Sequence, residues 1–135
     1  MAANKIIECA RECLGTPFRH QGRLIGVGMD CAGLIAHVLN SFGLPCIDEK
    51  GYPRTPVDGK IKRILDAEPS LERINELEAG CVILFRITKE PQHVAIYTGS
   101  GIIHSYLAVG EVVESGIGDK WRKRIVGLYR IKIDE

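Results

Sequence analysis

Hydrophobic positions in the first third of the chain follow a helical period. Those of residues 3–14 are Ile6, Ile7, Ala10 and Leu14. Those of the next segment form a wider stripe, made of Leu34, Ile35, Val38, Leu39 and Phe42. Gly15-Thr16-Pro17 ends the first pattern, whereas Asp30 and Gly43 stand where the second helix would have its N-cap and its C-terminal stop. We therefore predict one helix over residues 3–14 and another from Asp30 to about Phe42.

The pattern changes to short strands after Ala79. Residues 18–29 are rich in glycine and residues 44–55 contain prolines, so both are expected to be loops, and Val57–Ala67 predicts a short helix. The later apolar and β-branched runs are Val82–Ile87, Val94–Thr98, Gly101–Tyr106, Glu111–Glu114 and Ile125–Ile133. Helices followed by consecutive strands indicate an α+β fold, with helices packed on an antiparallel sheet of about five strands.

Length and charge narrow the class of protein. The 135 residues fit a single domain over residues 1–135, and 45% hydrophobic residues with a net charge of +1 are typical of a globular protein. No apolar run reaches the ~18 residues that span a bilayer, and the N-terminus lacks the apolar core of a secretory signal. We expect no nucleic-acid partner, no membrane insertion and no signal peptide.

One cysteine is placed for nucleophilic chemistry. The five cysteines are irregularly spaced and include no Cys-x-x-Cys pair, which favours free thiols. Cys31 falls in the first turn of the second predicted helix, where backbone amides favour a thiolate and would receive the oxyanion of a tetrahedral intermediate. Cys9 and Cys13 lie four residues apart on the first helix; we expect core residues there, although this spacing also permits half of a metal site.

Two histidines fall on a predicted hairpin. If Thr98-Gly99 forms its turn, His93 and His104 lie directly opposite each other on one face, whereas a turn at Ser100-Gly101 would move them out of line. The first register lets one imidazole act as base for Cys31 while the other orients it. A zinc site made of this thiolate and both imidazoles is the chemical alternative, but no fourth ligand is evident. We expect no metal and no cofactor.

Four segments together resemble the NlpC-type papain-like cysteine peptidases, which cut the peptide stems of bacterial cell walls. They are Leu14–Phe18, Asp30–Leu34, His93–Gly99 and Ile103–Tyr106. The resemblance extends over about residues 9–131 and implies a papain-like fold. It implies that Cys31 is the nucleophile, His93 the general base and acid, and His104 the orienting residue. The implied substrate bond is a stem amide, typically D-γ-glutamyl to diaminopimelate, cleaved through a thioester.

Two residues depart from the pattern of that family. Phe18 replaces a Tyr whose hydroxyl lies near the reacting centre, so the oxyanion is expected to rely on the Cys31 amide and another group such as His20. Ala32 replaces a Ser that often helps bind the polar end of the peptide. Asp30 is expected to act either as a receptor for the substrate amine or only as the N-cap.

Within the family, the chain looks most like the short peptidases of phage tails and gene-transfer particles. Residues 19–22, 112–115 and 121–130 carry this resemblance. It implies an enzyme that is made in the host cytoplasm, is carried in the virion tail beside other tail-tip proteins, and opens the wall for DNA entry. The alternative from another class is a structural tail-tip component with a weakened peptidase site.

Overall fold

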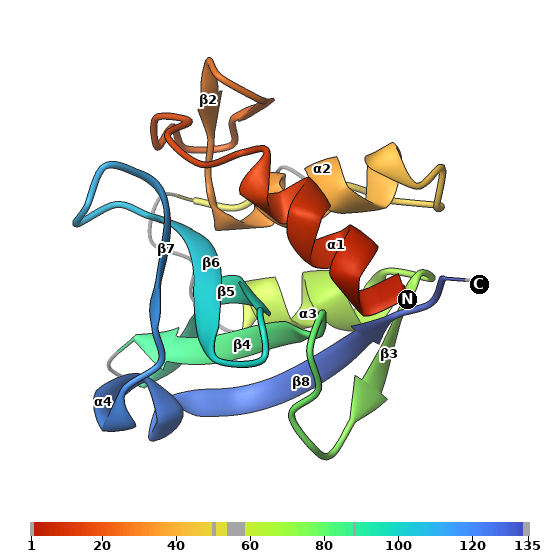
Figure 1. The fold of residues 1–135 in the computed structure, drawn as a ribbon, viewed down its shortest axis with the longest axis vertical. Coiled ribbons are helices and arrows are strands. Elements are labelled where there is room, and N and C mark those ends of the chain that lie inside the picture. Colours follow the sequence, from red (N-terminus) through yellow and green to blue (C-terminus); the bar gives the residue numbers. More distant parts are fainter. Residues whose placement is uncertain (1, 50, 54–58, 88, 134–135) are drawn as a thin grey trace.

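The computed structural model describes residues 2–49, 51–53, 59–87 and 89–133. Within them, α1 (Ala2–Arg11), α2 (Cys31–Ser41) and α3 (Lys60–Ala67) pack on an antiparallel sheet of six strands in the order β3-β8-β4-β5-β6-β7 (Figure 1). The strands are β3 (Leu71–Ile74), β4 (Val82–Ile87), β5 (Glu90–Tyr97), β6 (Gly101–Tyr106), β7 (Glu111–Gly116) and β8 (Ile125–Ile131). The predicted α+β class is confirmed, with six strands rather than about five.

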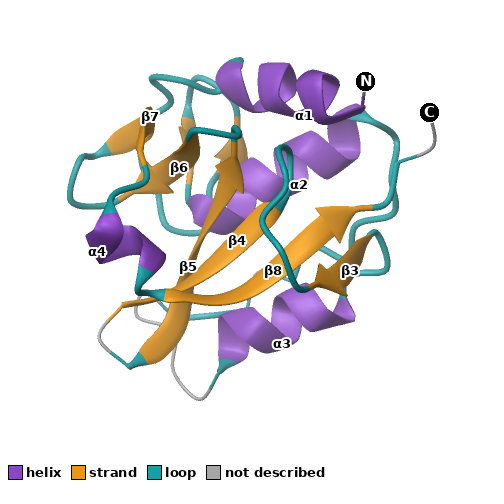
Figure 2. Cartoon of the chain, turned by 60° about the horizontal axis from the view of Figure 1, so that its bottom comes forward, coloured by secondary structure: helices purple, strands orange, loops and turns teal. Residues whose placement is uncertain are grey.

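A hairpin, a short helix and an edge strand had no counterpart in the prediction. The segment expected to be a glycine-rich loop contains a short hairpin, β1 (Arg23–Leu24) with β2 (Gly28–Met29). The short helix α4 (Asp119–Arg122) follows β7 (Figure 2). The third is β3, which pairs with β8 and buries Leu71 while its two central residues are exposed. A short edge strand carries few apolar residues, so its sequence gives only a weak signal.

The first helix is shorter than predicted, because it ends at Arg11 rather than continuing to residue 14. Leu14, which was expected on the buried stripe, is 44% exposed. Gly15 follows it with a φ of +86°, a conformation that turns the chain away from the helical path. Of the predicted third helix, Val57 and Asp58 lie outside the described residues, and the described part begins at Lys60.

The caps of α2 agree with the prediction and fix the position of Cys31. Asp30 is the N-cap, and its Oδ1 accepts a hydrogen bond of 2.8 Å from the backbone N–H of Gly33. At the other end, Gly43 adopts a φ of +67°, and the backbone N–H groups of Gly43 and Leu44 donate to the carbonyls of Asn40 and Leu39. This pair of bonds is a Schellman motif, which satisfies carbonyls that the helix leaves unpaired.

Both faces of the central strands are buried. Val82 and Leu84 point to the core beneath the helices, where α1 and α2 lie side by side (Figures 1 and 2). The alternate residues Ile83 and Phe85 belong to a second apolar cluster, against which Trp121 of α4 packs. Two covered faces explain why β4 reads as a continuous apolar run. Among the described helices, none has both the length and the hydrophobicity to cross a membrane.

Candidate active site

Cys31, the first residue of α2, opens into a cleft of about 350 Å³. His93 of β5 lines the same cleft, and so do three of the four other predicted site residues, Phe18, His20 and Asp30. The backbone N–H of Val94, next to His93, hydrogen-bonds to the Cys31 thiol. The structure therefore brings the predicted nucleophile and the predicted base to one cavity.

His104 of β6 lies behind His93 and contacts it directly. The Nε2 atom of His93 and the Nδ1 atom of His104 are 2.7 Å apart, and the two residues are only 5% and 3% exposed. When His93 donates this bond, its Nδ1 atom carries a lone pair that can accept the proton of a thiol. The contact therefore fits a base held in one tautomer by a third group.

The hairpin that carries the histidines has a register different from both alternatives considered above. Its turn is Gly99-Ser100, because the Thr98 N–H donates to the Gly101 carbonyl at 2.9 Å and Ile96 pairs with Ile103. Gly99 has a φ of +101°, and a type II′ turn requires a glycine at its first central position. The shift is one residue on each strand, so both histidines keep the same face and meet diagonally rather than directly across.

Aromatic rings surround the two imidazoles. The ring of Trp121 lies 5.5 Å from that of His93, and the ring of Tyr106 lies 5.2 Å from it on the other strand. Burial lowers the pKa of His93, and the neighbouring His104 lowers it further; burial also lowers the pKa of His104. Both imidazoles are therefore neutral at neutral pH, which is the state required of a general base.

The Cys31 thiol does not behave as its place in the helix suggested. Burial raises its pKa to about 12, and the nearby Asp30 carboxylate adds to this effect. The backbone amides of Val94 and Ala32 lower the pKa but do not offset burial. The thiol is therefore protonated at rest, and a base must remove its proton as the sulfur attacks.

Cys31, His93 and His104 lie one after another rather than around one point. Among the described residues, the one group of three metal-ligating side chains whose ligand atoms lie within 4.8 Å of one another is Cys9, Glu12 and His37. Cys31, His93 and His104 do not form such a group. A metal needs its ligands to converge on one point, whereas a proton relay needs them in sequence, so the geometry favours the relay.

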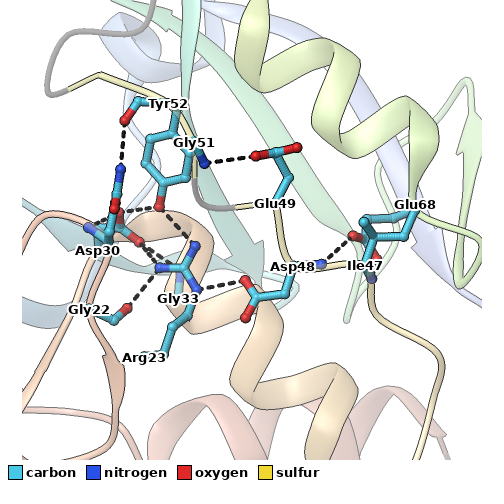
Figure 3. Close-up of polar contacts among 11 residues, drawn as sticks. Gly22, Arg23, Asp30, Gly33, Ile47, Asp48, Glu49, Gly51, Tyr52 and Glu68 are labelled. Carbon is cyan, nitrogen blue, oxygen red and sulfur yellow. Dashed lines mark hydrogen bonds and ion pairs between the residues drawn. The ribbon is translucent and has the colours of Figure 1, made fainter.

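Asp30 is fully engaged by the protein itself. Its Oδ1 accepts hydrogen bonds from Gly33 and Arg23, and its Oδ2 accepts from the backbone of Gln21 and the hydroxyl of Tyr52. Figure 3 shows Arg23 and Tyr52 converging on this carboxylate. A carboxylate offers about four acceptor positions, and all are in use here. The geometry therefore favours the N-cap role over reception of a substrate amine.

Arg23 and Tyr52 are site residues that the sequence did not reveal. Arg23 also donates to Asp48 at 2.7 Å, and Tyr52 lines the cleft with its ring centroid 5.4 Å from that of His20 in an edge-to-face arrangement. Both come from segments whose glycine and proline content predicted only loops. Gln21 adopts a φ of 60°, which is unusual for a residue other than glycine, and its backbone N–H donates to Asp30. This conformation is visible only in the structure.

The two departures from the family pattern occupy different places. Phe18 lines the cleft, where a tyrosine hydroxyl is thus missing, and His20 lines it as well. Ala32 borders a neighbouring depression that it shares with Arg23 and Asp48. Within the described residues, Ala32 is not part of the cleft lining, so its missing hydroxyl bears less directly on the reacting centre than Phe18 does.

Replacing His104 tests whether it positions His93. We expect His104→Leu to lower kcat by roughly 10³ and to leave KM nearly unchanged, because His93 loses the partner that fixes its tautomer. His104→Asn keeps an amide oxygen that can accept from His93 and should lose about tenfold to a hundredfold. Steady-state kinetics on a soluble stem peptide checks both values, and equal rates for the Leu and Asn variants would contradict the role.

The Arg23–Asp30 pair should matter for stability. Arg23→Met leaves a buried carboxylate without its cation, and we expect the free energy of unfolding to fall by about 3 kcal/mol. Arg130 pairs with Glu72 and Glu78 at the exposed surface, so Arg130→Met is the matched control and should change stability far less. Urea denaturation measures both, and similar losses in the two variants would contradict the assignment.

The buried histidines should make the fold sensitive to acid. Their pKa values are lowered in the folded state, so below the ordinary pKa of about 6.5 the unfolded chain binds more protons and stability falls as pH decreases. Complete protection of one histidine corresponds to a loss of about 2 kcal/mol between pH 7 and pH 5. His104→Asn should remove about half of the loss of stability that the two histidines cause between pH 7 and pH 5. Urea denaturation at both pH values checks this, and an unchanged loss of stability would contradict it.

Comparison with known proteins identifies the family of this chain. A model of the NlpC/P60 family matches residues 15–130, so the chain belongs to the NlpC/P60 family. Murein DD-endopeptidase MepH from Escherichia coli (strain K12) is 27% identical over 135 residues, covering 97% of this chain and 45% of that protein. The peptidoglycan-hydrolase family resemblance read from the sequence is thereby confirmed.

Solved structures show the same fold. An NlpC/P60 family protein from Bacillus cereus ATCC 10987 superposes with a TM-score of 0.74 at 23% identity, covering 98% of this chain and 41% of that chain. RipD from Mycobacterium tuberculosis, a non-catalytic NlpC/p60 domain protein adapted to peptidoglycan binding, has a TM-score of 0.61 at 18% identity and 98% coverage of both chains. The chain spans less than half the length of MepH and of the B. cereus protein.

Proposed function

We propose that this chain is a cysteine endopeptidase that hydrolyses amide bonds in the stem peptides of peptidoglycan. The observation that carries the proposal is the contact between His93 and His104 behind the cleft that Cys31 opens into. Family membership supports the substrate class, because MepH, a relative that is 27% identical to this chain, is named as a murein endopeptidase. Cys31 is the nucleophile, His93 the base and His104 the positioning residue.

The first half of the reaction is acylation. The Nδ1 atom of His93 takes the proton of the Cys31 thiol while the sulfur attacks the carbonyl carbon of the stem amide. The backbone N–H of Cys31 donates to the oxyanion of the tetrahedral intermediate. Protonated His93 then gives its proton to the leaving amine, the C–N bond breaks, and a thioester between the acyl group and Cys31 remains.

Hydrolysis completes the cycle. His93 removes a proton from water, the resulting hydroxide attacks the thioester carbonyl, and the C–S bond breaks. The proton held by His93 returns to the sulfur, so the neutral thiol and the neutral imidazole are restored. His104 accepts the hydrogen bond from His93 Nε2–H throughout and stabilises the imidazolium that forms in each half.

Release of peptide from purified sacculi tests the proposal. Wild-type protein should solubilise new amine termini from sacculi, and His93→Gln should release none above the level of buffer alone. The same samples, centrifuged with sacculi, report binding separately from cleavage. Bound protein without release of amines would overturn the enzyme proposal and support a wall-binding module.

A wall-binding module without catalysis is the second candidate. Phe18 removes a hydroxyl from the cleft, and RipD shows that this fold exists in a non-catalytic form. The Cys31, His93 and His104 side chains are all present here, which favours the enzyme. Phe18→Tyr should raise kcat severalfold if the missing hydroxyl limits turnover, and it should change sedimentation with sacculi little.

The bond that is cut belongs to the proposal at a finer level. The sequence resemblance points to D-γ-glutamyl to diaminopimelate, whereas the name of MepH specifies a DD-endopeptidase. Because Asp30 is engaged by Arg23 and Tyr52, a free amine on the stem is not required for binding at that carboxylate. We propose the γ-glutamyl bond because the sequence resemblance points to it. The engagement of Asp30 supports cleavage within stems that are still attached to glycan.

The biological setting is proposed from the sequence alone. Residues 19–22, 112–115 and 121–130 resemble the short peptidases of phage tails, which supports an enzyme carried in a virion tail that opens the wall for DNA entry. Phage that carry Cys31→Ala should then assemble normally and fail to infect. Failure of these phage to assemble would instead support a structural role beside other tail-tip proteins.

A further inference from the structure

Three potential metal ligands meet where α1 and α2 pack together. Cys9 belongs to α1, Glu12 follows its last turn, and His37 lies on α2. The Cys9 sulfur, a Glu12 carboxylate oxygen and a His37 ring nitrogen all lie within 4.8 Å of one another. None of these three residues lines the cleft that contains Cys31 and His93. The group is therefore a separate feature of the interface between the two helices.

The donor set suits zinc. Zinc takes thiolate, imidazole and carboxylate ligands at about 2.0 to 2.3 Å, which places neighbouring ligand atoms about 3.5 Å apart around a tetrahedron. The observed upper limit of 4.8 Å is wider than this, and side-chain rotation can shorten it, because Glu12 directly follows α1 and lies three residues from Cys9. One thiolate and one carboxylate balance the charge of a Zn²⁺ ion, and water completes a site of three protein ligands.

The surroundings leave the three groups accessible to an ion. Cys9 is 7% exposed, His37 is half-buried and Glu12 is exposed, so the group forms a short path from solvent to the sulfur. The Ser41 hydroxyl contacts both the Cys9 thiol and, at 3.5 Å, the His37 ring. The nearest cation on the same helix, Arg11, is directed to Glu8 and Glu114 instead of Glu12.

We propose that Cys9, Glu12 and His37 bind one Zn²⁺ ion, with a water molecule as fourth ligand, and that the ion clamps α1 to α2. Binding replaces the Cys9 thiol proton with the metal, and that proton passes to the buffer. Because α2 begins at Cys31, the clamp strengthens the element that holds the nucleophile without taking part in the reaction.

Calorimetric titration of Zn²⁺ tests the site. The Cys31→Ala background is used so that the reactive thiol does not compete for the ion. We expect one equivalent of Zn²⁺ with a Kd of about 1 μM or tighter, proton release that differs between buffers of different ionisation enthalpy, and a rise in Tm of at least about 5 °C at saturation. Binding of Co²⁺ in place of zinc should give a thiolate-to-cobalt absorption band.

Matched variants make the result decisive. Glu12→Gln and His37→Gln change exposed or half-buried residues, so both variants should fold, and each should weaken zinc binding at least about tenfold. Cys9→Ser should abolish the cobalt charge-transfer band. Cys46→Ser, which removes another free and half-buried thiol, should leave binding unchanged. Absence of binding, or binding that survives both His37→Gln and Cys9→Ser, would overturn the proposal, whatever the outcome of the peptidase assays.

Discussion

Cys31→Ala is expected to lower kcat on purified sacculi by about five orders of magnitude or more, because it removes the atom that forms the thioester. Stability should change little. The side chain lines the cleft and is only partly buried against the edge of the core, and alanine is a good residue for the first turn of a helix. The measurement pairs amine release from sacculi with a thermal melt of the same preparation, and Tm should stay within a few degrees of wild type.

A second cysteine supplies the control for this variant. Cys46→Ala removes a half-buried thiol that lies outside the cleft, so it should retain nearly full activity. Undiminished hydrolysis by Cys31→Ala would remove the basis of the mechanism. Loss of activity in Cys46→Ala at an unchanged Tm would show that the assay responds to something other than the nucleophile.

His93→Gln is expected to have the second largest effect, a loss of about 10⁴ in kcat. The resting thiol is neutral because burial raises its pKa, so loss of the imidazole removes the group that takes its proton. Glutamine fills a similar volume among Phe85, Tyr106 and Trp121, which keeps the aromatic packing largely intact. Turnover of a soluble stem peptide, measured from pH 5 to 9, compares the two proteins over the range in which the wild-type imidazole is neutral.

Non-additivity separates a relay from two independent contributions. Nucleophile and base act on the same proton, so the double variant Cys31→Ala with His93→Gln should be no slower than Cys31→Ala alone. Exogenous imidazole should also restore part of the activity of a His93→Gly variant. Additive losses, or a base variant that imidazole cannot rescue, would contradict the role given to His93.

The sequence predicted the parts of the fold whose signals are local. The capped amphipathic pattern placed α2, and with it Cys31, to within one residue, and the runs of β4 and β6 matched their observed bounds. The pairing of His93 with His104 survived an error in the hairpin register. A shift of one residue on each strand preserves which face a side chain occupies, so the prediction of a shared face did not depend on the turn.

Features that depend on distant segments could not be predicted. Arg23, Asp30 and Tyr52 come together from a hairpin, a cap and a connection, and no spacing in the sequence relates them. The helix N-terminus at Cys31 suggested a lowered thiol pKa, but burial by the surrounding fold outweighs it. Both are consequences of tertiary packing, which periodicity does not encode.

Mass spectrometry of the released muropeptides tests most directly whether Cys31 is the nucleophile that cuts the γ-glutamyl bond of the stem. Sacculi treated with wild-type protein should yield fragments that end in a new D-glutamyl carboxylate, with matching fragments that begin at diaminopimelate, and Cys31→Ala should yield neither. Equal fragment yields from the two proteins would contradict the account.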